Sequence, residues 1–260
     1  MYQAKSIAAT GLRNQQRRLD AIAHNVANAN TTAFKSPRLD FKDALYTTGH
    51  TPGPPRTPAP EGNQQKGHGL MVAGIGRDWR TGNFERTERM LDFALENEGF
   101  FTLSDENGDL LYTRNGSFHL SVEADGAYLV NGDGLYVLDD NANRILLPFG
   151  TTTVNVGVDG TMEFRYGDEI IGGAKLGLYT FRNLHGLESV GMSNFRQAPS
   201  AGERLDAGAV VVRQGILEGS NINLAEEMTR LIRTQRAFQL ASRALTTADD
   251  MQGIANNMRR

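Results

Sequence analysis

Acidic and amide side chains occur twice with the spacing that opens a calcium-binding loop. The two sets are Asp105, Asn107 and Asp109, and Asp139, Asn141 and Asn143. Such a loop also needs a glycine at its sixth position and a bidentate glutamate at its twelfth. These positions hold Leu110 and Gly116 in the first set, and Arg144 and Gly150 in the second. We therefore expect both stretches to be hairpin turns and not calcium sites.

Histidine, serine and glycine do not complete a catalytic or cofactor site either. The five histidines are scattered, with no pair four residues apart: His24, His50, His68, His119 and His185. Ser117 and His119 would share one face of a strand, but the sequence offers no acid to orient the imidazole. Gly74-Ile75-Gly76 lacks the third glycine and the long helix of a dinucleotide-binding motif, so a turn next to a strand is expected. We expect no enzymatic activity, no metal and no cofactor.

The composition excludes further classes of protein. With 260 residues, of which 22% are charged and 39% hydrophobic, the chain has the make-up of a soluble protein of two or three structural units. A net charge of −3 argues against a nucleic-acid binder, and the absence of cysteine excludes disulfides and thiol chemistry. No apolar run reaches 18 residues, so no membrane insertion is expected. The N-terminus lacks the apolar segment of a cleaved signal peptide.

The first 30 residues have the pattern of a long amphipathic helix. A stripe repeats at intervals of four and three residues, as in a coiled-coil seam, with one polar member. It consists of Ala8, Leu12, Gln15, Leu19, Ile22 and Val26. A helix over residues 3–28 would be about 40 Å long at 1.5 Å per residue.

A second amphipathic helix is expected at the other end of the chain. Residues 224–252 contain neither glycine nor proline, and Asn223 and Glu226 have the spacing of an N-cap and its capping-box partner. The stripe of this helix consists of Leu224, Met228, Leu231, Phe238, Leu245 and Met251 or Gln252. Two explanations remain open: an ordinary helix pair that covers a domain core, or a pair that packs into a larger assembly.

The middle of the chain differs from both ends in composition and in sequence pattern. Residues 49–69 hold five of the eight prolines and read as a linker or an extended arm. Residues 71–215 read as short strands, and three sequences predict tight hairpins: ENGD at 106–109, RNGS at 114–117 and VNGDG at 130–134. The negative charge also falls in the middle, because residues 1–30 and 224–260 both carry more basic than acidic residues.

Three separated stretches resemble the signatures of one family, the bacterial flagellar rod and hook proteins. The stretches are NVANANTTAFK at 25–35, LDFALENEGFF at 91–101 with YTRNGSFHL at 112–120, and LEGSNINLAEEMTRLIRTQRAF at 217–238. The match spans the chain in the family's order. Ala33 and Asn97 replace two glycines of these signatures, and alanine is strained at position 33 if the backbone there has a positive φ.

The resemblance implies an α+β fold with a role in assembly. The N- and C-terminal helices would pair as a coiled-coil-like core segment, and a mainly β middle domain would face outward. The expected domains are 1–45 (helix and turn), 46–70 (arm), 71–215 (outer β domain) and 216–260 (C-terminal helix). The GLESVG stretch at 186–191 and the last signature are most like the distal-rod members, with the proximal rod as the alternative.

The resemblance also implies a function and partners. A distal-rod subunit polymerises into a rigid tubular drive shaft that transmits torque from motor to hook and encloses the export channel. The implied partners are further copies of the chain, other rod proteins, the hook protein, the rod cap, the bushing of the L and P rings, and the type III export apparatus. The implied location is the basal body, reached without a cleaved signal peptide.

The site residues follow from this reading. Residues assigned to subunit assembly are Leu12, Leu19, Ile22, Val26, Asn25, Asn28, Asn30, Leu224, Met228, Leu231, Phe238 and Leu245. The asparagines would satisfy backbone groups freed where the first helix ends, and would form hydrogen bonds between subunits. Phe41 and Leu45 either form an i, i+4 pair on one helical turn or match the family's Phe-x-x-x-hydrophobic export-recognition element.

Two alternative functions belong to other classes of protein. A cell-wall carbohydrate-active enzyme would need a pair of catalytic carboxylates, which the sequence does not reveal. A secreted β-rich binding module or adhesin would explain residues 71–215, but it would leave the two terminal helices without a role.

Overall fold

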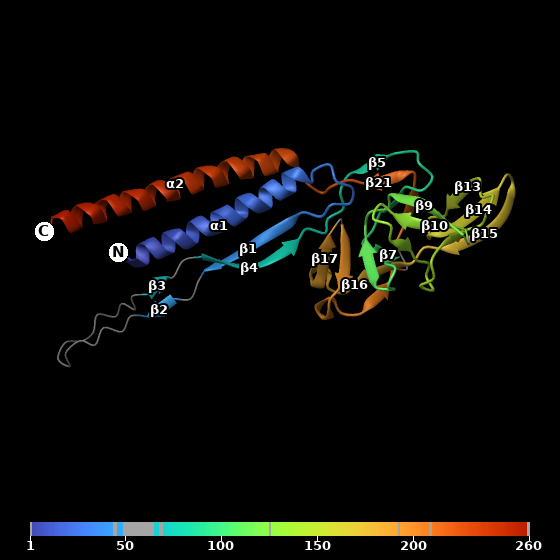
Figure 1. The fold of residues 1–260 in the computed structure, drawn as a ribbon, viewed down its shortest axis with the longest axis horizontal. Helices are drawn as coiled ribbons and strands as arrows, with labels where there is room; N and C mark the ends of the chain where they lie inside the picture. Colours follow the sequence, from blue (N-terminus) through green and yellow to red (C-terminus); the bar gives the residue numbers. More distant parts are fainter. Residues whose placement is uncertain are drawn as a thin grey trace. The chain divides into compact units, whose positions relative to one another are not determined.

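The computed structural model describes residues 2–43, 46–48, 65–67, 70–124, 126–191, 193–207 and 210–258. One long helix lies at each end of the chain, with short strands between them (Figure 1). The chain forms two compact units. The helical unit comprises residues 1–27, 37–76 and 223–260, and the β unit comprises residues 28–36 and 77–222.

The helical unit contains two helices and two strand pairs. Helix α1 spans Tyr2–Ala27 and helix α2 spans Leu224–Asn257; they contact each other and run antiparallel (Figure 1). Strand β1 (Pro37–Asp43) pairs with β4 (Leu70–Arg77), and β2 (Tyr46–Thr48) pairs antiparallel with β3 (Gln65–Gly67). Neither helix is apolar enough over sufficient length to span a membrane, among the residues described.

Helix α2 begins where the sequence predicts. The N-terminus of α2 is capped by Asn223, whose Oδ1 accepts a hydrogen bond from the Glu226 backbone N–H at 3.3 Å. The Glu226 carboxylate does not complete the capping box but pairs with Arg230 at 2.5 Å. Less exposed positions of α2 recur at intervals of four and three residues, with Ala237 and Ser242 half-buried beside them: Glu227, Leu231, Thr234, Phe238, Ala241, Leu245, Ala248 and Gln252.

The β unit is built from short strands and two 3-10 turns. Their bounds are β5 Phe84–Arg86, β6 Phe93–Leu95, β7 Phe100–Ser104, β8 Leu110–Thr113, β9 Phe118–Glu123, β10 Gly126–Asn131, β11 Tyr136–Val137, β12 Leu146–Leu147, β13 Thr153–Val156, β14 Thr161–Tyr166, β15 Glu169–Lys175, β16 Leu178–Phe181, η1 Leu184–Gly186, β17 Leu187–Gly191, β18 Asn194–Gln197, η2 Pro199–Ala201, β19 Arg204–Asp206, β20 Val212–Gln214 and β21 Ile216–Glu218. A ten-stranded sheet follows the order β12-β10-β11-β7-β8-β18-β17, with β9, β16 and β19 attached to it. A three-stranded antiparallel sheet, β13-β14-β15, and the pairs β20-β6 and β21-β5 complete the unit.

Two aromatic-rich cores lie on opposite faces of strand β7. Consecutive strand residues point to opposite faces, so the neighbours Phe100 and Phe101 enter different cores. Phe101 packs edge-on against Phe118 at 5.2 Å, within the larger core. Phe100 packs against Phe181 and Trp79 at 5.9 Å and 5.5 Å, within the smaller one.

Two of the three predicted hairpins are confirmed, and one is wrong. ENGD joins β7 to β8, and the NGDG turn joins β10 to β11, both antiparallel. RNGS does not form a hairpin, because β8 pairs with β7 and β18 whereas β9 pairs with β10. Arg114 turns inward there, and Gly116 passes so close to Phe93 that an added Cβ would lie 1.9 Å from the Phe93 carbonyl oxygen.

The calcium-like stretches form turns closed by their own first aspartates. Asp105 Oδ1 accepts hydrogen bonds from the backbone N–H groups of Asn107 and Asp109 at 2.8 and 2.9 Å. Asp139 Oδ1 accepts the two equivalent bonds from Asn141 and Asn143 at 2.9 and 2.7 Å. The aspartate and asparagine spacing that resembled a metal loop is therefore a means of closing the turn.

Two local predictions are wrong. Gly74-Ile75-Gly76 lies within strand β4 and is not a turn. Phe41 lies in strand β1, so it is not part of a helical turn, and Leu45 lies outside the described residues. Most of the proline-rich segment, residues 49–64, also lies outside them. The four expected domains describe roles in an assembly and stay a prediction.

Candidate assembly site

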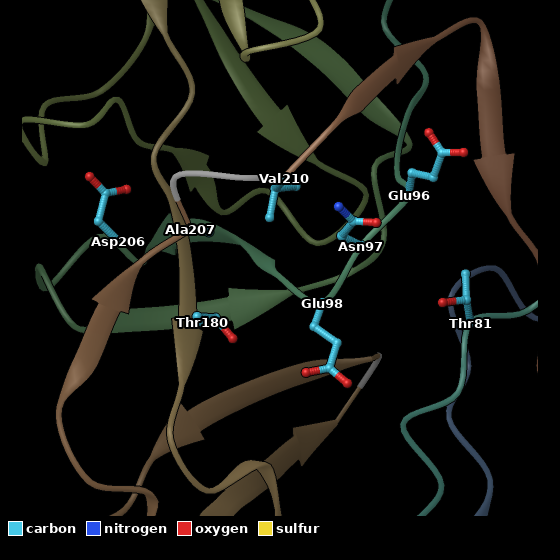
Figure 2. A pocket seen from close by; sticks show the side chains of 8 residues that line it. All are labelled: Thr81, Glu96, Asn97, Glu98, Thr180, Asp206, Ala207 and Val210. Carbon is cyan, nitrogen blue, oxygen red and sulfur yellow. The ribbon is translucent and has the colours of Figure 1, made fainter.

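An open cavity in the β unit has acidic walls but no catalytic arrangement. Its volume is about 650 Å³, and it is lined by Thr81, Glu96, Asn97, Glu98, Thr180, Asp206, Ala207 and Val210. Figure 2 shows the carboxylates of Glu96, Glu98 and Asp206 spread around the opening rather than directed at one another. Glu96 is already paired with Arg213 at 2.8 Å. No group of three or more metal-ligating side chains occurs among the described residues.

The predicted assembly residues of α1 and α2 divide into two groups. Most lie on the less exposed faces of the helices, with Ile22 and Asn25 buried and the others half-buried: Leu12, Leu19, Val26, Leu231, Phe238 and Leu245. Leu224 and Met228 are 42% and 48% exposed, so they belong to a different face of α2. The alternative at the end of the stripe is also settled, because Gln252 is half-buried and Met251 is exposed.

Helix α2 carries further exposed apolar side chains. They are Ile232, Leu240, Met251 and Ile254, and the exposed Met258 follows directly after the helix. Together with Leu224 and Met228 they make up what we call the outer apolar surface of α2. An exposed apolar surface of this extent is typical of a region that contacts another molecule.

The asparagine-rich stretch after α1 forms a compact turn. Thr31 donates both from its backbone N–H to the Asn28 carbonyl oxygen and from its hydroxyl to Asn28 Oδ1, each at 3.2 Å. Asn28 is half-buried and Asn30 is exposed. Ala33 has a φ of +53° and is fully buried, with its N–H bonded to the Glu218 carbonyl oxygen at 2.7 Å. The strain foreseen for alanine at this position is therefore present, at about 1–2 kcal/mol.

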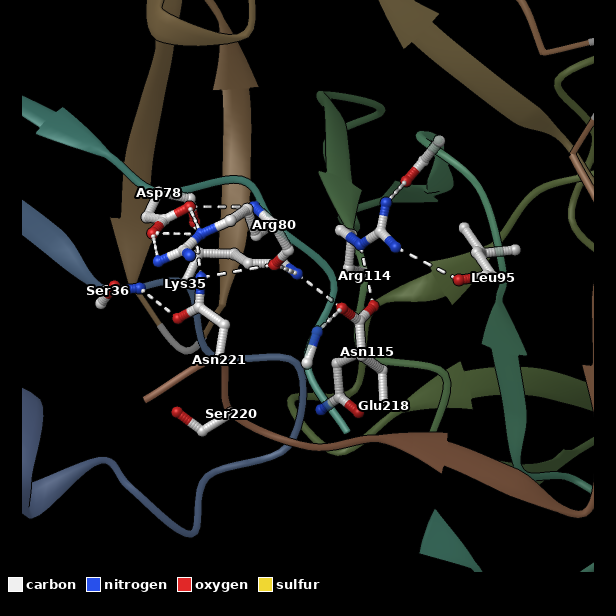
Figure 3. A network of polar contacts seen from close by, with 12 residues as sticks. Lys35, Ser36, Asp78, Arg80, Leu95, Arg114, Asn115, Glu218, Ser220 and Asn221 are labelled. Carbon is white, nitrogen blue, oxygen red and sulfur yellow. Dashed lines mark hydrogen bonds and ion pairs between the residues drawn. The ribbon is translucent and has the colours of Figure 1, made fainter. Parts of the chain in front are cut away.

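A buried ion network lies next to this turn (Figure 3). Glu218 Oε1 accepts from Lys35 Nζ at 2.5 Å and from the Gly82 backbone N–H at 2.9 Å, and Glu218 Oε2 accepts from Arg114 Nε at 2.9 Å. The side chains of Lys35 and Glu218 are completely buried, and that of Arg114 is 3% exposed. The Arg114 guanidinium also donates to the carbonyl oxygens of Leu95, Asn97 and Gly99.

The network contains two cations and one anion. Burial lowers the pKa of the Lys35 ammonium below its ordinary value of 10.5, and the positive charge of Arg114 lowers it further. Glu218 and, to a smaller extent, Asp78 act in the opposite direction and raise this pKa. Lys35 is therefore the surplus cation, since Arg114 alone already neutralises the carboxylate.

Asn221 ties three segments of the β unit together. Its Oδ1 accepts from the Ser36 N–H at 3.0 Å, and its Nδ2 donates to the carbonyl oxygens of Asp78 at 2.8 Å and Arg80 at 3.3 Å (Figure 3). The chain passes into the helical unit directly after Ser36, directly before Arg77 and directly after Ile222. The ion network and Asn221 therefore fix three of the points at which the chain leaves the β unit.

Sequence reasoning assigned no role to Lys35, Arg114, Glu218 or Asn221. All four lie in the signature stretches, but their partners are far away in the chain: Lys35 and Glu218 are 183 positions apart. The available signal was a charged residue next to apolar ones, as for Lys35 after Phe34 and Glu218 after Leu217. Such a residue is normally solvated, and when it is buried it needs a partner.

Phe41 is half-buried in the helical unit. The guanidinium carbon of Arg18 lies 5.9 Å from the centre of its ring. The export role expected for Phe41 and Leu45 stays a prediction.

Comparisons with known proteins cover the whole chain. Three family models match: "Flagella basal body rod protein" at residues 6–35, "Flagellar hook protein FlgE/F/G D1 domain" at 94–164, and "Flagellar basal body rod FlgEFG protein C-terminal" at 213–258. The chain is 35% identical to the flagellar basal-body rod protein FlgG of Borreliella burgdorferi, covering 100% of both chains. It is 33% identical to FlgG of Bacillus subtilis, covering 96% of this chain and 97% of that protein. It is 29% identical to the flagellar hook-basal body complex protein FlhP of Bacillus subtilis, covering 100% of both chains.

Proposed function

Since the chain belongs to the family of flagellar basal-body rod proteins, and within it to the FlgG proteins, it is a structural subunit of the distal rod, and we propose that its terminal helices build the wall of that rod. The proximal-rod alternative is not favoured. Membership in this family implies self-assembly and association with other basal-body components.

We propose that α1 and α2 pair as an antiparallel coiled-coil-like segment that packs against copies of itself. The intervals of three and four residues on both helices support the pairing. The outer apolar surface of α2 carries the proposal of packing between copies, because amphipathic helices gain most of their stability from packing. The β unit would then face outward, with domain ranges as expected from the sequence.

The outer apolar surface supplies the test. Replacing Leu240 and Ile254, which are 66% and 59% exposed, by glutamine removes apolar area from α2 without disturbing the side that faces α1. We expect the variant to be exported and folded, and to be absent from purified basal bodies. Arg236→Lys, an exchange at an exposed position of the same helix that removes no apolar side chain, is the matched control. Normal rods built from the double variant would refute the proposal.

The asparagines after α1 and the proline-rich arm have proposed roles in the same assembly. We propose that Asn25, Asn28 and Asn30 end the helix and form hydrogen bonds between subunits. The arm, residues 49–69, is proposed to bridge neighbouring subunits and to stiffen the tube. The β2-β3 pairing supports an arm whose two ends lie side by side.

The remaining partners are proposals as well. We propose contacts with other rod proteins, the hook protein, the rod cap and the bushing of the L and P rings, and export by the type III apparatus without a cleaved signal peptide. Phe41 and Leu45 would be recognised in the unfolded chain during export. Alanine at both positions should lower the amount of chain outside the cell while leaving the amount synthesised unchanged.

A further inference from the structure

The helical unit contains a cavity whose wall includes two of the predicted assembly residues, Ile22 and Asn25. It has a volume of about 280 Å³ and is bounded by α1, β1 and the first turns of α2. Helix α1 contributes Arg18 and Asn25, strand β1 contributes Arg38, and helix α2 contributes Glu227 and Arg230. A water molecule occupies about 30 Å³ in the liquid, so the cavity has room for a side-chain group.

Two buried oxygen atoms in its wall have no hydrogen-bond partner in the described chain. They are Asn25 Oδ1 and Glu227 Oε2, on residues that are 5% and 6% exposed. The other ends of both side chains are engaged: Asn25 Nδ2 donates to the Pro37 carbonyl oxygen at 3.5 Å, and Glu227 Oε1 accepts from Arg230 at 2.9 Å. Buried polar atoms are normally bonded, so two unpaired acceptors lining one cavity indicate a missing donor.

The charges around the cavity restrict what that donor can be. Arg230 is paired with Glu226 and Glu227, and Arg38 with Asp40 at 3.1 Å. Arg230 is shared by two carboxylates, so these three residues carry a net charge of −1, and the positive charge of Arg18 brings the surroundings of the cavity close to neutral. A lysine or arginine entering the cavity would upset this balance, and a carboxylate cannot donate to the two oxygens.

A primary carboxamide satisfies these conditions. Its NH₂ group carries two N–H donors, one for each unpaired oxygen, and its carbonyl oxygen can accept from the edge of the Arg18 guanidinium. Arg18 can offer that edge while the face of the group lies over Phe41. The group is neutral, so it brings no further charge into the cavity.

We propose that this cavity is a socket which, in the assembled rod, receives the side-chain carboxamide of an asparagine or glutamine from a neighbouring copy of the chain. The inference rests on the proposed function, because a rod built from these helices places copies against one another. Helix α2 exposes carboxamides at Gln235, Gln239 and Asn257, next to the outer apolar surface that is proposed to pack between copies.

The test compares two adjacent glutamates. Glu227→Gln keeps the shape of the side chain and an oxygen for Arg230, but it presents an NH₂ group to the socket in place of the acceptor. Glu226→Gln is the matched control, because Glu226 is also paired with Arg230 but does not line the cavity. Each full-length variant is expressed in cells lacking the wild-type protein. The chain in purified basal bodies and the melting temperature of the soluble monomer are then measured.

We expect at least tenfold less of the Glu227→Gln chain in basal bodies, whereas Glu226→Gln stays within about twofold of wild type. The two variants should melt at similar temperatures, because Arg230 is 53% exposed in both pairs and solvent can replace the lost charged contact. Equal incorporation of both variants would overturn the socket and leave the proposed function standing. If Glu227→Gln also lowers the melting temperature of the monomer, its reduced incorporation would be explained by impaired folding, and this outcome would overturn the socket too. Failure of wild type and Glu226→Gln to enter basal bodies would refute the proposed function, and the socket with it.

Discussion

Removing the buried anion and removing a buried cation from the Lys35–Glu218–Arg114 network should have very different consequences. Glu218→Gln leaves two buried cations without a counter-charge. Breaking a buried ion pair by removing one partner costs about 3–5 kcal/mol, so we expect the free energy of unfolding to fall by at least that amount. Lys35→Met removes the surplus cation and leaves Glu218 paired with Arg114 at 2.9 Å.

The small effect expected for Lys35→Met follows from the remaining contacts. The Arg80 carbonyl oxygen, which accepts from Lys35 at 2.7 Å, also accepts from Asn221 at 3.3 Å. Glu218 Oε1 keeps the N–H of Gly82. No polar atom of these groups loses its last partner, and the methionine fills a similar volume, so the free energy of unfolding should change by less than about 1 kcal/mol.

The assay is denaturant unfolding of the purified chain followed by the fluorescence of Trp79. This is the only tryptophan in the sequence, and it packs in the smaller core of the β unit, so its signal reports that unit. Glu96→Gln is the control, because its partly exposed pair with Arg213 should contribute less than about 1 kcal/mol. If Lys35→Met is as destabilising as Glu218→Gln, the ammonium is a net stabilising charge and the reasoning is wrong.

The pH dependence of stability, compared between wild type and Lys35→Met, should change in a defined direction. The pKa of Lys35 is lower in the folded chain than its ordinary value of 10.5, because burial disfavours the charged form. Between those two pKa values the unfolded chain binds more protons, so this residue makes stability rise as the pH approaches 10.5. The difference in unfolding free energy between wild type and Lys35→Met should therefore shift in favour of wild type over that range. A shift in the opposite direction would contradict the assigned cause.

Three further predictions concern the assembly segments. Ala33→Gly should change the unfolding free energy by less than about 0.5 kcal/mol in the same denaturation assay. It relieves about 1–2 kcal/mol of strain, but it also loses a buried methyl group and gives the unfolded chain more conformational entropy. Ala33→Val should cost at least about 2 kcal/mol, because the larger side chain keeps the strain and overpacks a fully buried site. Asn28→Leu with Asn30→Leu should block rod assembly, counted as basal bodies by electron microscopy, while leaving the Trp79 signal unchanged; normal rods would refute the role of these asparagines. Replacing residues 49–64 by Asn-Gly, a two-residue turn that suits the β2-β3 pairing, should give a flexible, hook-like tube in place of a straight rod, and an unchanged rigid rod would show that the arm does not stiffen it.

The elements that depend on local sequence could be predicted. The stripes of α1 and α2 need only side chains three and four positions apart, and both helices form close to the expected bounds. The ENGD hairpin likewise depends on a local turn, closed by Asp105. The RNGS hairpin failed because a distant partner prevailed: Arg114 is drawn inward by Glu218, 104 positions away, and the chain continues into β9 without pairing back.

The polar sites could not be predicted, because they depend on which segments meet. Nothing in the neighbourhood of Glu227 or Asn25 shows that both side chains face one cavity with an unpaired oxygen. For the same reason Lys35 reads as an ordinary surface lysine at the end of the first signature. Phe41 was placed on a helical turn because Phe and Leu four positions apart favour one, but pairing of β1 with β4 decides the local structure.

Replacing Asn221 tests whether its side chain holds together the segments of the β unit that it contacts. Asn221→Leu preserves volume but leaves the Ser36 N–H and the Asp78 carbonyl oxygen without the bonds of 3.0 and 2.8 Å that the amide makes. Each lost bond is worth about 1 kcal/mol or more, so local opening should become easier by roughly tenfold. Hydrogen exchange should therefore accelerate at Ser36 and at its sequence-distant neighbours 78–82, and remain unchanged in β7. Faster exchange at Ser36 alone would show that the segments open independently and that Asn221 does not couple them.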